Sequence, residues 1–285
     1  MLYKKKNLIG LTGSTGLLGN SLKTKIRKIK NYKLKVYRHD ITNKHQLQKW
    51  FDENNFDCFI HLAAIVPVKK VIQNIDYAKK VNVTGTKNLI KEVNNKKSIK
   101  WFFFSSTSHV YEFQNKKINE NSLTKPFSVY GKTKLDAEKY ILQNINKKIK
   151  FCLGRIFSLE GKEKDISYFL PGILNKIKQK KKIKIDLKQF RDFVHVDDVS
   201  DVIIKLMKNN NKGIFNIASG IKISFKEIII LLEKLLKQKI NFQDNRYNNV
   251  KSSYANISKI SKAIKWTPKK NISYIIKDYL KGKSF

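Results

Sequence analysis

A glycine-rich turn near the N-terminus is the feature that most constrains this fold. A short apolar run over residues 7–12 leads into Gly13, Gly16 and Gly19, which are spaced three residues apart. Leucine and isoleucine then recur at helical spacing from Gly16 to about Lys30. A buried strand, a glycine turn and a helix in this order predict the start of a parallel sheet with a dinucleotide site.

Each glycine has a separate physical role in such a turn. Gly13 permits the tight turn, Gly16 lets a pyrophosphate approach the backbone, and Gly19 lets the helix pack closely on the strand. The first N–H groups of the helix and the positive end of its dipole then bind the phosphates. The same segment supplies three further predicted cofactor contacts, Thr15, Leu17 and Leu18. The alternative is an ordinary strand-to-helix turn that holds no ligand.

Strand-like and helical patterns alternate over the first 160 residues. After the first strand and helix, the sequence predicts strands at 34–38, 56–64, 101–106 and 149–156 and helices at 44–52, 74–95 and 129–146. Such alternation predicts parallel strands joined by right-handed crossovers. The expected fold class is therefore α/β, a doubly wound parallel sheet, with residues 1–160 forming a dinucleotide-binding domain.

The pattern loosens after residue 160. Helices are predicted at 168–180 and 225–237, after Asp197–Asp198 and within 257–281, and strands at 183–187, 193–196 and 214–218. We expect residues 161–285 to form a smaller mixed α/β lobe that mainly binds substrate. Segments near 191–218 are expected to return to the sheet of the first domain.

The formal net charge of +38, from 60 Lys and Arg against 22 Asp and Glu, suggests a nucleic-acid partner at first sight. Only five of the basic residues are arginines, however, and the lysines are spread along the whole chain. Nucleic-acid surfaces favour arginine for its bidentate fork and its stacking. We therefore do not expect a nucleic-acid partner, although a basic patch with a polyanionic partner stays the alternative. Such a field also favours a small anionic substrate.

The cysteines, the histidines and the apolar runs of the sequence argue against a disulfide framework, a metal site and a membrane span. Cys58 and Cys152 lie in apolar runs without a C-x-x-C motif, which favours buried thiols in a reducing cytoplasm. The five histidines lack metal-ligand spacing, so no metal is expected. No run of 18 apolar residues is present, and the N-terminal apolar stretch leads into the glycine turn. We expect neither a membrane span nor a signal peptide.

The end of the second predicted strand selects between the two nicotinamide dinucleotides. Arg38 stands there, and a basic residue at this point accommodates a ribose 2′-phosphate. The prediction therefore favours NADP. Asp40 follows two residues later and keeps NAD open, because a carboxylate can bind the ribose 2′-hydroxyl. The alternative for Arg38 is a surface cation.

Tyr130 and Lys134 are four residues apart and share one face of a predicted helix. The phenol of free tyrosine ionises near pH ~10, and a neighbouring ammonium stabilises its phenolate. A tyrosine in this setting can exchange a proton with a carbinol while a hydride moves to or from a nicotinamide. Thr107 follows the fourth strand, at the edge of the sheet where ligands bind, and its hydroxyl would hold the same oxygen.

Taken together, these motifs resemble the extended short-chain dehydrogenase/reductases, specifically the NAD-dependent epimerase/dehydratase family. The matching segments are TGSTGLLG (12–19), HLAA (61–64), VNVTGTKNL (81–89), FFFSSTSHVY (102–111), YGKTK (130–134), RDFVHVDDV (191–199), FNIASG (215–220) and NISKISKAIKWTP (256–268). The resemblance covers nearly the whole chain. It implies a Rossmann sheet that holds the dinucleotide and a nucleotide-activated sugar as substrate.

The resemblance also implies roles for single residues. Thr107, Tyr130 and Lys134 match the catalytic residues of the family. Further implied cofactor contacts are Asp40, Ile41, Leu62, Ala63, Ala64, Ser105 and Ile156. Implied substrate contacts are Thr107, Ser158, Arg191 and Arg246, of which the two arginines would bind the diphosphate. A homodimer packed through the helices near 74–95 and 129–146 is implied as well.

Departures from the family pattern narrow the reaction. The sugar dehydratases carry an Asp-Glu pair where Ser108 and His109 stand in this chain, so no carboxylate is available to drive an elimination. This leaves 4-epimerisation of a nucleotide sugar or reduction of a keto-sugar. The remaining alternative is a non-catalytic protein with the same fold that binds RNA or senses NADP.

Overall fold

The computed structural model describes residues 7–66, 68–113, 116–162, 164–245 and 252–281. Two compact units divide the chain, and each combines segments that are distant in sequence. The first unit contains residues 1–112, 123–156 and 199–215, and the second contains 113–122, 157–198 and 216–285. Segment 113–122 therefore groups with the second unit, although it lies inside the N-terminal half of the sequence.

The first part of the chain alternates strands and helices. Its elements are β1 (Asn7–Thr12), α1 (Leu17–Arg27), β2 (Tyr32–Val36), α2 (Lys44–Asp52), β3 (Cys58–His61), α3 (Val68–Gln73), α4 (Ile75–Lys79), the π-helix η1 (Lys80–Gly85), α5 (Thr86–Asn95), β4 (Trp101–Thr107), the 3₁₀-helix η2 (Ser108–Val110), β5 (Lys117–Ile118), α6 (Val129–Asn144) and β6 (Lys150–Ile156). All the predicted strands and helices of this part are present. The predicted second strand begins and ends two residues earlier than expected.

Shorter elements dominate the rest of the chain. They are β7 (Ser158–Glu160), α7 (Phe169–Lys178), β8 (Ile183–Ile185), β9 (Phe190–Arg191), β10 (Phe193–His195), α8 (Val196–Lys208), β11 (Gly213–Ile217), β12 (Ile223–Ser224), α9 (Phe225–Leu236), β13 (Phe242–Asp244), β14 (Tyr254–Ala255), α10 (Ser258–Ile264) and α11 (Ile272–Leu280). Most β elements here form two-stranded pairs.

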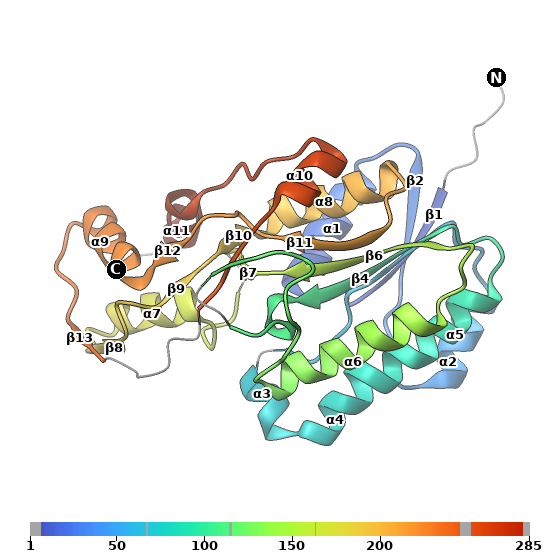
Figure 1. The fold of residues 1–285 in the computed structure, drawn as a ribbon, viewed down its shortest axis with the longest axis horizontal. Coiled ribbons are helices and arrows are strands. Elements are labelled where there is room, and N and C mark those ends of the chain that lie inside the picture. Colours follow the sequence, from blue (N-terminus) through green and yellow to red (C-terminus); the bar gives the residue numbers. More distant parts are fainter. Residues whose placement is uncertain (1–6, 67, 114–115, 163, 246–251, 282–285) are drawn as a thin grey trace. The chain divides into compact units, whose positions relative to one another are not determined.

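Six parallel strands form the main sheet in the order β11-β6-β4-β3-β1-β2. Helices α2, α5 and α6 cover one face, and α1 and α8 cover the other (Figure 1). A hydrogen bond from the Ser200 hydroxyl to Ser21 joins α8 to α1. The predicted doubly wound fold is therefore confirmed. The strand order reverses at β1, because β2 is added on one side of it and β3 and the later strands on the other. The gap between β1 and β3 is therefore the switch point at which open α/β sheets bind ligands.

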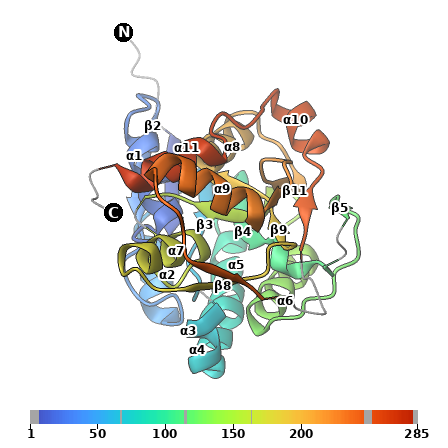
Figure 2. The same cartoon turned by 90° about the vertical axis from the view of Figure 1, so that its left-hand side faces the viewer.

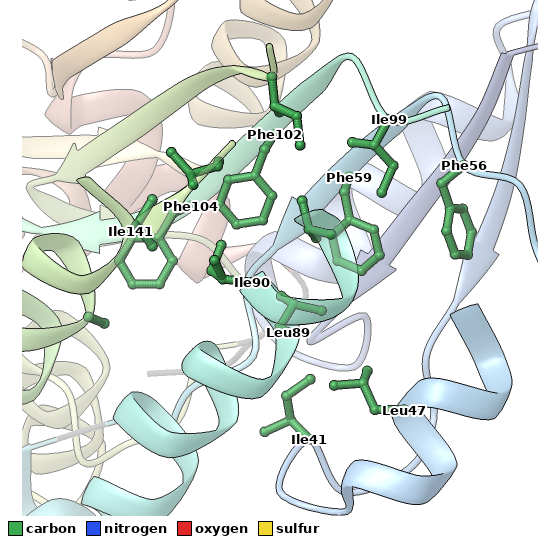
Figure 3. Packing of buried hydrophobic residues seen from close by; sticks show 14 of the residues in the cluster. Ile41, Leu47, Phe56, Phe59, Leu89, Ile90, Ile99, Phe102, Phe104 and Ile141 are labelled. Carbon is green, nitrogen blue, oxygen red and sulfur yellow. The ribbon is translucent and has the colours of Figure 1, made fainter. Parts of the chain in front are cut away.

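Aromatic and aliphatic side chains fill the space between the sheet and the helices α2, α5 and α6. Phe59 and Phe102 stack with their ring centroids 6.4 Å apart on adjacent strands. Figure 3 shows these rings facing Leu89 and Ile90 of α5. Phe104 lies on the same face of β4, so this core extends to the carboxyl end of that strand, where the predicted catalytic residues stand.

The second unit has a core of its own. Its buried residues come mainly from α7, α9 and α11 and include Leu170, Ile228, Leu232 and Ile276. Helix α9 starts with a capping box, in which Ser224 and Glu227 satisfy each other's backbone N–H groups. Figure 2 shows α9 and α11 side by side.

Candidate active site

The glycine turn adopts a backbone conformation that only glycine takes without strain. Gly13 has a φ of +71°, and a Cβ there would lie 2.6 Å from the backbone nitrogen of Ala63. At Gly19 a Cβ would lie 2.1 Å from the carbonyl oxygen of Gly13. These contacts pack α1 onto the turn and the turn onto the segment that follows β3.

Gly16 differs from Gly13 and Gly19, because a Cβ at this position would make no close contact. The nearest atom to a Cβ at this position would be the Gly13 carbonyl oxygen, 3.7 Å away. Gly16 is also the N-cap of α1, and no side chain caps the helix there. Uncapped N–H groups at the positive end of the helix dipole, beside an open glycine, fit a pyrophosphate.

A buried hydrogen-bond chain begins directly before this turn, at the switch point. The Thr86 hydroxyl donates to the carbonyl oxygen of Asn82 at 2.7 Å and lies 3.0 Å from Nε2 of His61. His61 therefore donates through Nε2, and its Nδ1 accepts the hydroxyl of Thr12 at 2.7 Å. Burial and the charge of Lys134 lower the pKa of His61 to about 3, so the ring is neutral. The imidazole thus acts as a structural link between strand ends.

The loop after β3 is held by the same chain. The N–H groups of Leu62 and Ala63 both point to the Thr12 hydroxyl oxygen, at 3.3 Å. Leu62, Ala63 and Ala64 are half-buried beside the glycine turn. Their position fits the predicted lining of a cofactor site.

The two residues predicted to discriminate between NADP and NAD, Arg38 and Asp40, lie just past β2. Arg38 and Asp40 are exposed, and Asp40 accepts a hydrogen bond from the N–H of Thr42. Ile41 is buried and packs against Gly85 of the π-helix. Arg38 therefore stands at the sheet edge with its charge in solvent, available to an anionic group.

Helix α6 presents Tyr130 in its first turn. The Ser128 hydroxyl caps the helix by accepting the N–H of Gly131 at 3.1 Å. A Cβ on Gly131 would lie 2.3 Å from the carbonyl oxygen of His109, so α6 packs tightly on η2. The rings of His109 and Tyr130 meet edge to face, with centroids 5.7 Å apart. The close packing at Gly131 fixes Tyr130 next to the segment that follows Thr107.

Lys134, one turn further along α6, is 2% exposed. Its ammonium lies 4.0 Å from the centre of the Phe104 ring, near the end of β4. Burial lowers the pKa of Lys134 to about 7, and the Glu138 carboxylate opposes that shift.

Thr107 is buried at the end of β4, and its hydroxyl oxygen accepts the N–H of His109 at 3.3 Å. Ser105 is half-buried on that strand, and Ile156 is buried at the end of the neighbouring strand β6.

The helix predicted at 74–95 contains a π-helical segment, which periodicity did not predict. Asn82 lies within it and is 1% exposed. Its amide oxygen accepts the N–H of Ile65, and its amide nitrogen donates to the Thr133 hydroxyl at 3.1 Å. Thr133 in turn donates to the carbonyl oxygen of Tyr130. Asn82 therefore connects the loop after β3 with the turn of α6 that carries Tyr130 and Lys134.

The predicted substrate contacts Ser158 and Arg191 belong to the second unit. Ser158 is half-buried at the start of β7, which pairs with β10. The guanidinium of Arg191 lies over the stacked rings of Phe169 and Phe225, at 4.9 and 5.4 Å. Within the described residues it forms no ion pair with Asp192 or Asp197. Arg246 lies outside the described residues.

The remaining expectations concern metals, thiols and membranes. No cluster of potential metal ligands occurs among the described residues. Neither Cys58 nor Cys152 forms a disulfide, and Cys152 is buried and donates its thiol to the carbonyl oxygen of Asn211 at 3.2 Å. Burial and the neighbouring Asp57 raise the pKa of Cys58 to about 12. None of the helices in the described part of the chain is long and apolar enough to cross a membrane.

Two charged residues beside the site were not predicted from the sequence. Glu138, four residues after Lys134, and Arg155, on β6, form a buried ion pair at 2.8 Å. The spacing of Tyr130, Lys134 and Glu138, four residues each time, was the available signal for Glu138, because it places all three on one helix face.

Residues 9–218 match the model of the family described as "NAD dependent epimerase/dehydratase family". The chain therefore belongs to this family, and the predicted resemblance is confirmed. A UDP-glucuronate 4-epimerase of Thermodesulfobacterium geofontis is 30% identical over 95% of this chain and 87% of its own length. A dTDP-4-dehydro-6-deoxyglucose reductase of Escherichia coli is 25% identical over 93% of each chain.

Solved structures agree with the fold. RMD from Pseudomonas aeruginosa, complexed with NADPH, superposes with a TM-score of 0.87 at 22% identity and covers 96% of this chain and 98% of its own. The two relatives named above are thus an epimerase and a reductase of nucleotide sugars.

The close packing of α6 on η2 predicts the effect of a single added methyl group. We expect Gly131→Ala to push Tyr130 out of place, lowering stability by about 1–3 kcal/mol and kcat/KM by about 10²-fold. Thermal unfolding and steady-state kinetics measure the two effects. Lys132→Ala, at the exposed neighbouring position, is the control. Wild-type kinetics in Gly131→Ala would contradict the proposed importance of this contact.

Proposed function

We propose that this chain catalyses hydride transfer on a nucleotide-activated sugar, as a 4-epimerase or a keto-sugar reductase, with Tyr130 as acid and base. The observation that carries the proposal is a half-buried tyrosine one helical turn from a buried lysine on α6, which packs on η2 at the carboxyl end of β4. The glycine turn and the uncapped α1 end at the same edge.

Two side chains would act on one oxygen of the sugar, and a third would act on one of these two. The Tyr130 phenolate removes the proton of this oxygen, or the phenol returns it, because a positioned acid or base lowers the barrier to proton transfer. The Lys134 ammonium stabilises the phenolate electrostatically. The Thr107 hydroxyl accepts the N–H of His109 and keeps its own proton to donate to the sugar oxygen.

A nicotinamide dinucleotide, when bound, accepts or supplies the hydride at the sugar carbon. Its pyrophosphate would be held by the N–H groups at the start of α1, beside Gly16. Leu62, Ala63 and Ala64 would line the site, together with Ser105 and Ile156. The hydrogen bonds of Thr12 and His61 keep this wall in place without taking part in the reaction.

Elimination of water is not part of the proposal. A dehydratase needs a carboxylic acid and a carboxylate beside the sugar, and Ser108 and His109 supply neither. Epimerisation and reduction both require only the proton exchange at Tyr130. They differ in whether the cofactor leaves oxidised after each turnover or is restored in place.

Substrate recognition is proposed for the second unit. Arg191 lies on two aromatic rings, which hold its planar guanidinium in one orientation and suit it to bidentate binding of a diphosphate. Ser158 and Arg246 are proposed as further substrate contacts. The similarity to an enzyme named for UDP-glucuronate supports UDP-sugars as the first substrates to test.

The function is tested with purified protein and UDP-, GDP- and dTDP-sugars, with NADPH absorbance and product stereochemistry recorded together. Stoichiometric loss of NADPH identifies a reductase, whereas a new epimer without net cofactor change identifies an epimerase. Dinucleotide binding without turnover of any sugar would overturn the enzymatic proposal in favour of a binding protein.

Loss of the phenol hydroxyl should abolish proton exchange. We expect Tyr130→Phe to lower kcat about 10²–10⁴-fold, the usual contribution of a general acid or base. Its cofactor affinity should stay near the wild-type value, and fluorescence titration with NADPH measures it. Tyr140→Phe, at the half-exposed position further along α6, is the matched control. Unchanged turnover in Tyr130→Phe would refute the mechanism.

We propose NADP as the preferred cofactor, because Arg38 is exposed at the end of β2. Arg38→Ala should raise the KM for NADPH about tenfold, the loss of one charge-assisted hydrogen bond, and leave the KM for NADH unchanged. Arg27→Ala removes an exposed cation from α1 and serves as control. A wild-type preference for NADH would contradict the assignment and transfer the selecting role to Asp40.

We also propose a homodimer that packs through α4 and α6. Ile75 and Tyr77 on α4 and Leu142 on α6 are exposed apolar side chains, and the two helices contact each other. Leu142→Glu should shift the protein from dimer to monomer, because it places a charge in an apolar interface. Light scattering measures the mass, and Ile230→Glu on α9 is the control. A monomeric wild-type protein would exclude the proposal.

A further inference from the structure

The buried ion pair of Glu138 and Arg155 beside Lys134 contains several hydrogen bonds. Nε of Arg155 donates to Oε1 and Oε2 of Glu138 at 3.1 and 3.2 Å, and Nη2 donates to Oε2 at 2.8 Å. The guanidinium also lies 4.7 Å from the centre of the Tyr111 ring. Glu138 and Arg155 are 1% and 4% exposed. Both oxygens of the carboxylate are therefore engaged by the arginine.

Lys134 lies one turn from this carboxylate on the same helix face. Lysine and glutamate four residues apart normally pair across one turn of a helix. In this structure the Lys134 ammonium forms no ion pair or hydrogen bond within the described residues and faces the Phe104 ring instead. Arg155 therefore binds the Glu138 carboxylate, with which Lys134 would otherwise pair.

We propose that Glu138 and Arg155 are a positioning pair for Lys134. Arg155 occupies both oxygens of the carboxylate and prevents it from pairing with the ammonium, which leaves the ammonium available to the phenol and the cofactor. Glu138, at one turn's distance, still supplies the negative charge that keeps Lys134 protonated. The inference rests on the role proposed above for Lys134.

The arrangement explains how an ammonium remains charged in an apolar site. Desolvation alone favours the neutral amine, and a carboxylate nearby favours the ammonium. The titratable groups next to Lys134 are Tyr130 and Glu138, each one turn away on α6, and His61 on β3, and Arg155 on β6 binds Glu138. His61 is neutral, as its hydrogen bonds require, and Arg155 shares its ion pair with Glu138. Burial lowers the pKa of Lys134, and the Glu138 carboxylate is the charge that opposes this shift.

Two variants should shift the ionisation of Lys134 in opposite directions. In Glu138→Leu/Arg155→Met the carboxylate is absent, so we expect the pKa of Lys134 to fall by about one unit or more. In Arg155→Met the carboxylate is released to pair with the ammonium, so the pKa should rise by a similar amount. The alkaline limb of kcat/KM, where the ammonium is lost, should move to lower pH in the first variant and higher pH in the second.

The pKa is measured without substrate, by NMR titration of protein carrying ¹³C-labelled lysine side chains. The Lys134 signal is identified by its absence in Lys134→Arg. Asp201→Asn, which breaks the Lys25–Asp201 ion pair elsewhere in the first unit, is the control and should leave the signal unchanged. If Arg155→Met fails to fold, the double variant decides, because apolar replacement of both partners is usually tolerated.

If Glu138 and Arg155 have only a structural role, the two variants will lower the unfolding temperature but leave the pKa of Lys134 and the pH profile of kcat/KM unchanged. That result overturns the inference. Failure of the proposed function is a different outcome, since Tyr130→Phe would then keep full turnover while the NMR titration of Lys134 still shifts in the two variants.

Discussion

An ammonium group buried next to an aromatic ring is the constraint on which the candidate site depends. Removal of the Lys134 charge from water is unfavourable, so the surroundings must offset that loss for the ammonium to persist. The ring of Phe104 and the negative charge of Glu138 offset part of that loss, and burial still lowers the pKa of Lys134 to about 7. The position of Lys134 in turn depends on α6, whose first turn is held by the Ser128 cap and by the contact of Gly131 with His109.

A single hydrogen-bond chain extends from the strand that precedes the glycine turn to the first turns of α6. It passes from Thr12 through His61 and Thr86 to Asn82, and from there through Thr133 to the backbone of Tyr130. These groups are uncharged and almost completely buried, so each hydrogen bond left unmade would cost the full desolvation of its donor or acceptor. The glycine turn and α6 are therefore held in register by side chains that need not touch a ligand.

Sequence patterns predicted the parts of the site that depend on local rules. Glycine spacing identified the turn, because Gly13 and Gly19 are required sterically, and helical spacing placed Tyr130 and Lys134 on one face. Apolar runs predicted the strands, since central strands are buried on both faces. Thr107 was predicted from its place at the end of a strand, and the family resemblance added the expected cofactor contacts after β3, which no spacing rule could supply.

Long-range pairings could not be predicted in this way. Arg155 and Glu138 meet because β6 lies beside β4 beneath α6, and only the strand order reveals that neighbourhood. The role of Arg191 is similar, since its aromatic platform comes from two helices distant in sequence. Segment 113–122 joined the second unit for the same reason, through the pairing of β5 with β14.

The π-helical turn between α4 and α5 makes the length of this region unusually sensitive. A π-turn accommodates one residue more than regular α-helix would. A one-residue deletion within Lys80–Gly85 would restore the ordinary helical hydrogen bonds and so improve the helix locally. It would also rotate the preceding turns by about 100° relative to those that follow. Either Asn82 would turn away from Thr133, or the face of α5 that packs on Phe59 would turn away from the core. The deletion would therefore give a more regular helix and break the connection to α6.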